Sequence, residues 1–389
     1  MQTTPAGGIA YTDDRYNAFL NRIFDSVHTV IAPHLDLDIH HNATHTQPAL
    51  LELLAYCGIH GEFVNGGAKT HRYSRDHTAL PTQKRSPNSR ALGRHLRGLE
   101  YWTVTTQFDH ARTALLKLAR TARLLPDRAD IAIDTHDWLY YGRADTPMVG
   151  ETHYENGTDL AFKYVTACLV TPELRLTLAA EPITTDSHLP VLLEHVLGQA
   201  AEWVDIRRVY LDRGFYETRI LQVLEAHDLD YVVRARRFPS LAPEDGEPAV
   251  QVEHDYQVGG SRPPYDTVTV SRFCVPHAQR PAEKQSYFVT NLAVDEDWAP
   301  QLANAYRRRW GIETSYRVIK DFLPRCRSTY FVVRLFYFLF AVMLYNLWVV
   351  VNALLTLVFT TSSADQLVTA GVFGRVLRAR WLIAASAVT

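Results

Sequence analysis

Apolar and polar positions follow two different periods along the chain. In the first third, apolar residues recur at spacings of three and four, which predicts helices at residues 14–31, 47–57, 89–98 and 109–124. From residue 129 onward, period-two alternation and short apolar runs predict strands at 129–137, 160–170, 174–183, 207–212 and 230–235. Between these strands, helical spacing returns at 189–203 and 217–228. The chain is therefore expected to combine an α-helical N-terminal domain, residues 1–125, with a mixed α/β domain, residues 126–330.

The order of elements in the second domain restricts its fold. Three consecutive strands, a helix, and then alternating strand and helix is the order of a ribonuclease H-like sheet, although that order alone fits several mixed folds. Residues 237–283 contain Pro, Gly and short β-like runs, and they predict a β-rich insertion before a return strand at 286–292. We therefore predict an α/β ribonuclease H-like catalytic domain with this insertion, followed by a helical C-terminal region, residues 331–389.

Two aspartates stand at the C-terminal ends of predicted strands. Asp134 follows the apolar run ADIAI, and Asp212 follows RRVYL. Ligand sites of open α/β sheets gather at that edge, because side chains there project into a crevice beyond the strand ends. A single aspartate in such a place is more often a turn or N-cap residue. His136 and Asp137 follow closely, and Asp137 is the alternative ligand if the strand register differs.

A third acid, Glu313, belongs to the segment YRRRWGIETSYRVIK. Tyr306, Arg309, Glu313 and Lys320 are spaced by three, four and seven residues, so we predict that they share one face of one helix. This combination suits a surface that holds a metal ion and contacts phosphate. The alternative is a solvated helix face with an ordinary Arg–Glu pair.

Three carboxylates gathered by a fold provide hard oxygen ligands for Mg²⁺, and two such ions suit phosphodiester chemistry. The four cysteines are scattered without a C-x-x-C pair, which argues against a zinc ribbon and a disulfide scaffold. We therefore expect two Mg²⁺ ions, with Mn²⁺ as a possible substitute.

The net charge of −2 does not by itself indicate a nucleic-acid binder. Basic residues are nevertheless concentrated at 69–75, 84–97, 234–237 and 307–310. Candidate DNA contacts in the N-terminal domain are Lys84, Arg85, Arg90 and Arg94. The alternatives are ordinary solvated surfaces and a helical domain that only caps the catalytic one.

Residues 332–359 form an apolar stretch long enough to cross a bilayer. Arg334, Asn346 and Asn352 interrupt it, so a long buried helix is the preferred interpretation, and we expect no membrane association. The polar N-terminus does not resemble a signal peptide. The expected location is cytoplasmic and nucleoid-associated.

The pattern Y-x2-R-x3-E-x6-K is complete as Tyr306, Arg309, Glu313 and Lys320, and it is accompanied by LDRGFY, DYVVRAR and IDTHDWLYYG. Over roughly residues 129–350 the chain thus resembles the DDE transposases of insertion sequences, in the subgroup with this YREK signature (insertion-sequence family four), and its first block resembles archaeal members. The resemblance implies that Asp134, Asp212 and Glu313 bind the metal ions.

The resemblance also implies a reaction and partners. Tyr306, Arg309 and Lys320 would hold the DNA backbone at the transposon end. The protein would cleave double-stranded DNA at terminal repeats and transfer the strand into target DNA, as a homodimer on paired ends. A nuclease of the same fold without strand transfer and a non-catalytic DNA-binding derivative remain alternatives.

Overall fold

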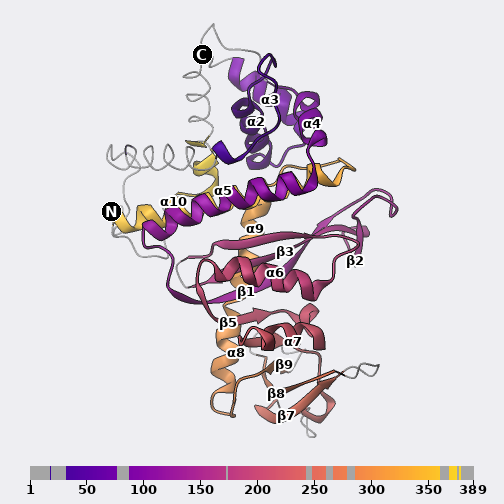
Figure 1. Cartoon of the computed structure of the whole chain (residues 1–389), viewed down its shortest axis with the longest axis vertical. Helices are drawn as coiled ribbons and strands as arrows, with labels where there is room; N and C mark the ends of the chain where they lie inside the picture. The colour runs from indigo at the N-terminus through magenta and orange to yellow at the C-terminus, as the bar shows by residue number, and fades with distance from the viewer. Residues whose placement is uncertain are drawn as a thin grey trace, which may run out of the picture. The chain divides into compact units, whose positions relative to one another are not determined.

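The structure is a computed structural model that describes residues 18, 32–76, 87–171, 174–241, 248–259, 266–277, 285–359, 368–374 and 376–377. The chain divides into two compact units (Figure 1). The sheet unit comprises Pro126–Leu139 and Gly150–Thr314, and the helical unit comprises Met1–Leu125, Tyr140–Val149 and Ser315–Thr389. Residues of the first and third predicted domains therefore fall in one unit, and the three-domain division stays a prediction.

The sheet unit contains a mixed sheet whose strands are β1 (Arg128–Leu139), β2 (Gly150–Glu155), β3 (Thr158–Val170), β4 (Thr177–Ile183), β5 (Asp205–Leu211), β6 (Asp230–Arg234), β7 (Gln251–Gly259), β8 (Thr267–Pro276) and β9 (Gln285–Thr290). The strand order is β2-β3-β1-β5-β6-β9-β8-β7, and β4 also pairs with β3. β1, β5 and β6 are parallel, whereas β3 runs antiparallel to β1 and β4 antiparallel to β3. This arrangement confirms the predicted mixed α/β fold.

Strand β1 lies inside the sheet and is buried on both faces. Ile131, Ala132 and Ile133 are fully buried, which explains why the strand reads as an apolar run rather than a strict alternation. The buried run ends at Asp134, so the sequence places a carboxylate at the end of the most protected part of the strand.

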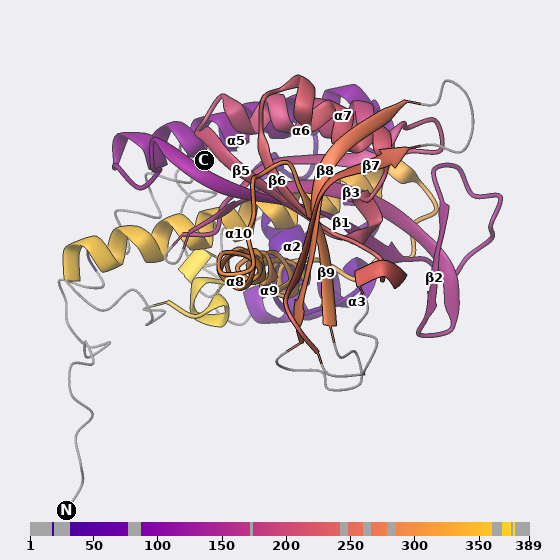
Figure 2. The ribbon, with the colours of Figure 1, turned by 90° about the horizontal axis from the view of Figure 1, so that it is seen from below.

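Helices cover both faces of this sheet (Figure 2). α6 (Leu189–Ala201) packs on β3, β4 and β5, and α7 (Thr218–Ala226) packs on β6 and β8. α8 (Ala299–Arg307) lies on the opposite face, where it contacts β8. Short 3-10 helices, η2 (Arg213–Phe215) and η3 (Pro239–Leu241), follow β5 and β6.

The predicted insertion contributes strands to the same sheet. Its described residues form the antiparallel pair β7–β8, and β8 pairs in turn with β9. β9 corresponds to the predicted return strand and joins β6. The insertion therefore extends the sheet at one edge.

The helical unit contains η1 (Ala32–His34), α2 (Gln47–Ile59), α3 (Val64–Asp76), α4 (Ser89–Gly98), α5 (Tyr101–Thr121) and α10 (Phe331–Phe359). α10 packs against α2, α4 and α5, and the rings of Phe108 and Phe336 meet edge to face at 5.0 Å. α9 (Trp310–Asp321) begins in the sheet unit, and its residues from Ser315 onward belong to the helical unit.

Helix α10 corresponds to the predicted apolar segment. The stretch Phe331–Val358 is long and apolar enough to cross a membrane, yet 78% of its most apolar window is buried within the protein. Arg334 and Asn346, which interrupt the apolar run, are also buried. This burial is the property expected of a core helix.

Apart from the short 3-10 helices, two described elements were not predicted. α3 has the polar sequence VNGGAKTHRYSRD, which lacks an apolar stripe, and β2 is a mostly exposed hairpin strand. Neither buries enough apolar surface to leave a periodic pattern in the sequence. The predicted helix at 14–31 lies outside the described residues except for Ala18.

Candidate active site

The two aspartates meet because β1 and β5 are parallel neighbours. In their register Ile133 lies opposite Leu211, so Asp134 and Asp212 each come one residue later, at the same edge. Asp212 begins the 3-10 helix η2, and its Oδ1 accepts a hydrogen bond of 2.9 Å from the backbone N–H of Gly214. Parallel pairing thus brings together two carboxylates that are far apart in the sequence.

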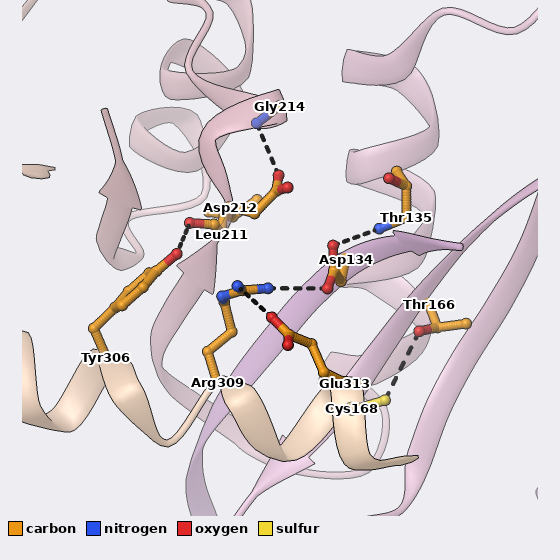
Figure 3. Close-up of polar contacts among 10 residues, drawn as sticks. All are labelled: Asp134, Thr135, Thr166, Cys168, Leu211, Asp212, Gly214, Tyr306, Arg309 and Glu313. Atoms are coloured by element: carbon orange, nitrogen blue, oxygen red, sulfur yellow. Dashed lines mark hydrogen bonds and ion pairs between the residues drawn. The ribbon is translucent and has the colours of Figure 1, made fainter. Parts of the chain in front are cut away.

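Arg309 connects this edge to Glu313 (Figure 3). Its guanidinium donates one hydrogen bond of 2.9 Å to Asp134 Oδ2 and another of 3.1 Å to Glu313 Oε1. Asp134 and Arg309 are buried, whereas the Glu313 side chain is 56% exposed. One cation therefore lies between two of the three predicted metal ligands.

The predicted single helix carrying Tyr306, Arg309, Glu313 and Lys320 is wrong: α8 ends at Arg307, and α9 begins at Trp310. Around the break, each backbone N–H bonds three residues back, as in Arg309 N–H to Tyr306 O at 2.9 Å. This tighter winding alters the helical phase between Tyr306 and Glu313. Arg309 thus lies in the turn between the two helices.

Gly311 allows this turn to pack closely against the loop before β4. A Cβ placed on Gly311 would lie only 2.6 Å from Nε of Arg175, so any larger residue would displace that side chain or the helix. The glycine in the WGIE segment thus allows the Arg175 side chain to approach the chain closely next to Arg309.

Tyr306 is 3% exposed, and its hydroxyl donates a hydrogen bond of 3.1 Å to the carbonyl of Leu211, the residue before Asp212. Its ring packs edge to face against Tyr210 and Phe288. Burial raises the pKa of the phenol to about 12. In this structure Tyr306 supports the end of β5, and its predicted contact with DNA stays a prediction.

Burial also changes the acid–base properties of Asp134. It raises the pKa of that carboxyl group to about 7, Arg309 opposes the rise, and the nearby charges of Asp212 and Glu313 add to it. All three predicted carboxylates therefore influence one another electrostatically. A site in which one acid is difficult to ionise without added positive charge is suited to cation binding.

Among the described residues, no group of three His, Cys, Asp or Glu side chains is close enough to form a ready metal cluster. The residues present nevertheless fit Mg²⁺, because the hard carboxylates of Asp134 and Glu313 both contact the Arg309 guanidinium, and the charge of Asp212 is close enough to raise the pKa of Asp134. The nearby Cys168 does not change this assignment. Burial raises the pKa of its thiol to about 11, so the thiolate that a soft metal would need is disfavoured.

The other predicted residues have different surroundings. Lys320 is exposed in the last turn of α9, two turns after Glu313. His136 is buried in β1, and Asp137 accepts a hydrogen bond from the Thr152 hydroxyl, away from Arg309.

The predicted N-terminal DNA contacts are only partly described. Arg90 and Arg94 are exposed on α4, and Lys84 and Arg85 lie outside the described residues. Arg90 and Arg94 belong to the helical unit, whereas the three predicted carboxylates belong to the sheet unit. These assignments stay predictions.

Asp130, Arg207 and Tyr210 form a hydrogen-bonded group near the site that the sequence did not indicate; Asp130 and Tyr210 are buried, whereas the Arg207 side chain is 50% exposed. Asp130 accepts hydrogen bonds of 2.6 Å from Arg207 and 2.9 Å from the Tyr210 hydroxyl. The ring of Tyr210 in turn packs on Tyr306. These contacts fix the neighbouring strands behind the carboxylates, and the only sequence signal for them is one acid inside an apolar run.

With this geometry established, comparison with known families is informative. Residues 127–347 match the model of the transposase DDE domain. The chain belongs to the DDE transposase family. The match spans the whole sheet unit and includes the three carboxylates and Arg309.

A solved transposase also shares the fold. The chain is similar to the piggyBac transposase in a synaptic complex with hairpin DNA, with a TM-score of 0.57 and 12% identity over 97% of this chain and 83% of that one. A comparison with curated proteins gave no match. The DDE transposase assignment therefore rests on the domain match, with the fold in agreement.

Proposed function

We propose that this DDE transposase cleaves double-stranded DNA at the ends of a transposon and transfers the freed strand into target DNA. The observation that carries the proposal is that Asp212, Glu313 and Arg309 all act electrostatically on Asp134, while Arg309 contacts both Asp134 and Glu313. We further assign the chain to the YREK subgroup, insertion-sequence family four, on the Tyr306, Arg309, Glu313 and Lys320 spacing.

Asp134, Asp212 and Glu313 would hold two Mg²⁺ ions, or Mn²⁺ in their place. When bound, such ions make the attacking oxygen more nucleophilic and stabilise charge on the leaving oxygen. The protein's own contribution is to fix the three carboxylates on a buried strand, a strand end and a helix. Burial of Asp134 excludes water from one side of the site and strengthens its electrostatic interactions.

Arg309 has a second role in this proposal. Its guanidinium neutralises Asp134 and Glu313 before DNA binds, and it would contact a phosphate bound at these carboxylates. Arginine suits this position because its planar group forms two parallel hydrogen bonds to phosphate or carboxylate oxygens. Lys320, exposed on the same helix as Glu313, would contact the DNA backbone farther along.

Strand transfer requires two transposon ends in one complex, so we propose a homodimer on paired ends. We also propose that the protein acts without a membrane, in the cytoplasm near the nucleoid. The same active site would serve a nuclease that cuts without joining.

The test is Mg²⁺-dependent cleavage of a labelled duplex that carries the flanking terminal repeat, followed by a joining assay with target DNA. Wild-type protein should cut at the repeat end and form joined products, while Asp212→Ala and Glu313→Ala should abolish both. Cutting without joining would favour the nuclease. Specific binding without cutting by folded wild-type protein would favour a DNA-binding derivative.

A further inference from the structure

The helical unit contains a cavity of about 710 Å³ that the proposed chemistry does not use. Three segments and the start of α10 line it: the turn between α2 and α3 with the first turn of α3 (residues 61–66), Gly93 and Arg97 of α4, residues 325–330, and Val333 and Tyr337 of α10. Pockets of this size commonly accept small organic ligands or single building blocks of larger ones. The question is which chemistry the lining would recognise.

The charge of the lining is mainly positive. Arg97, Arg325 and Arg327 are exposed at the cavity, and the carboxylate among the lining residues is Glu62. Asn65 and Gly66, in the first turn of α3, also line it, and the N-terminal end of a helix favours anions. Three guanidinium groups beside a helix N-terminus indicate a polyanionic ligand.

Aromatic rings accompany the arginines. The guanidinium of Arg327 lies 4.4 Å from the ring centre of Phe63, and that of Arg97 lies 5.4 Å from the ring centre of Tyr330. The Tyr330 side chain is a large apolar group that is 51% exposed. Proteins that bind single-stranded nucleic acids combine cationic grooves with exposed aromatic rings on which bases stack.

Hydrogen bonds hold this lining in place. Arg97 Nε donates to the carbonyl of Gly93 at 2.8 Å. Arg334, which is 2% exposed, donates to the carbonyls of Ser328 at 2.8 Å and Cys326 at 3.2 Å. The backbone N–H of Arg325 donates to Glu62 O at 3.1 Å, which joins two of the three segments. Hydrogen bonds within the fold therefore hold the cavity open, and the buried Arg334 fixes the segment before α10.

We propose that this cavity binds an unpaired nucleotide of a DNA strand, with its phosphate on Arg97, Arg325 and Arg327 and its base stacked on Tyr330. An unpaired nucleotide fits better than a duplex, because a concave site of this volume admits one nucleotide and a stacked base inside a duplex cannot reach the tyrosine ring. The inference rests on the proposed function only for the choice of DNA as partner. It adds a second DNA site, in a different unit from the carboxylates.

The experiment measures DNA binding in EDTA, where no cleavage occurs, by fluorescence anisotropy. The probes are a blunt duplex and the same duplex with a short single-stranded overhang. Wild-type protein should prefer the overhang by about tenfold, within the range expected for stacking of one base. Tyr330→Ala and Arg97→Glu should remove most of this preference, whereas Tyr330→Phe should retain it.

Arg120→Glu is the matched control, because it makes the same charge change at an exposed position of α5 that does not line the cavity. Thermal unfolding checks that each variant is folded. Equal binding of blunt and overhang DNA by wild type, or an equal loss in Arg120→Glu and Arg97→Glu, would overturn the proposal. So would binding of deoxyadenosine monophosphate alone as tightly as the overhang, since the site would then serve a free nucleotide.

The outcome is independent of catalysis. If the overhang preference is present but cleavage at the repeat is not, the pocket assignment stands and the proposed transposition fails. If cleavage occurs and the overhang preference is absent, the proposed cleavage stands and the pocket assignment fails.

Discussion

Arg309 donates a hydrogen bond of 2.9 Å to Asp134 although 175 positions separate them in the sequence. Asp134 is 8% exposed and Arg309 is 7% exposed, so neither charge is well solvated. Each of these groups depends on the other in the metal-free protein, because a buried charge without a partner is costly. The same carboxylate is a proposed metal ligand, so metal and guanidinium both compensate its charge.

Replacement of Arg309 by alanine should destabilise the metal-free protein. The change leaves Asp134 buried without its cation, a loss on the order of 3 kcal/mol for a buried pair, while the exposed Glu313 adds little. Urea unfolding in EDTA measures the free energy of unfolding. Added Mg²⁺ should recover part of the loss, since it supplies positive charge at the same carboxylates. The neighbouring exposed Arg308→Ala should change little, and an equal loss in both variants would contradict the argument.

The stability of the metal-free protein should fall as the pH rises from about 4 to about 7. Burial raises the pKa of Asp134 to about 7, whereas an unfolded aspartate titrates near 3.9, so in this range the folded protein retains a proton that the unfolded chain has released. Each pKa unit of difference between the folded and unfolded states corresponds to about 1.4 kcal/mol in the free energy of unfolding. The contribution is full below about pH 4 and is lost above about pH 7.

Asp134→Asn should flatten this pH dependence, because the amide does not titrate. Urea unfolding in EDTA at about pH 5 and about pH 7.5 measures how much the free energy of unfolding changes with pH. Asp137→Asn, three positions later on the same strand, is the control and should retain the wild-type slope. Identical slopes in the wild type and Asp134→Asn would show that this carboxyl group ionises normally.

Much of the fold could be predicted from the sequence because its strands and helices bury apolar faces. The predicted α4 agrees with the structure at both ends, and β1 and β5 agree to within two residues. The break between α8 and α9 could not be predicted, because RRRWG contains no helix-breaking proline and the three-residue backbone hydrogen bonds at the break leave no signal in the sequence. Spacing thus selected Arg309 and Glu313, which a hydrogen bond joins in the structure, while misjudging the helix geometry around them.

The sequence indicated where the candidate residues lie in the chain, but it did not indicate which side chains they contact in the fold. The Tyr306 spacing suggested an exposed helix face, yet the ring lies against Tyr210 and Phe288, which come from strands far away in the sequence. Arg97 belonged to a basic cluster that looked like solvated surface, and its place beside Tyr330 follows from the fold. Neither contact leaves a periodic signal along the chain.

Mg²⁺ should raise the melting temperature of the wild type and not that of Asp212→Asn. A ligand that binds only the folded state stabilises it by about 2.7 kcal/mol at a hundredfold excess over its dissociation constant. Differential scanning fluorimetry with and without Mg²⁺ measures the shift, and EDTA should reverse it. Asp228→Asn is a matched control with the same charge change, at an exposed position whose left-handed backbone asparagine tolerates. A shift that persists in Asp212→Asn would exclude this carboxylate as a ligand.

Tyr306→Phe distinguishes support of β5 from direct contact with DNA. The variant retains the ring packing and loses only the hydrogen bond to the Leu211 carbonyl, which should cost about 1 kcal/mol of stability. Because the hydroxyl is buried, the affinity for terminal-repeat DNA in EDTA should be unchanged, and Tyr306→Ala should cost considerably more stability through the lost packing. Urea unfolding and fluorescence anisotropy give the two values. A large loss of DNA affinity in Tyr306→Phe with unchanged stability would mean that the Tyr306 hydroxyl contacts a DNA phosphate directly.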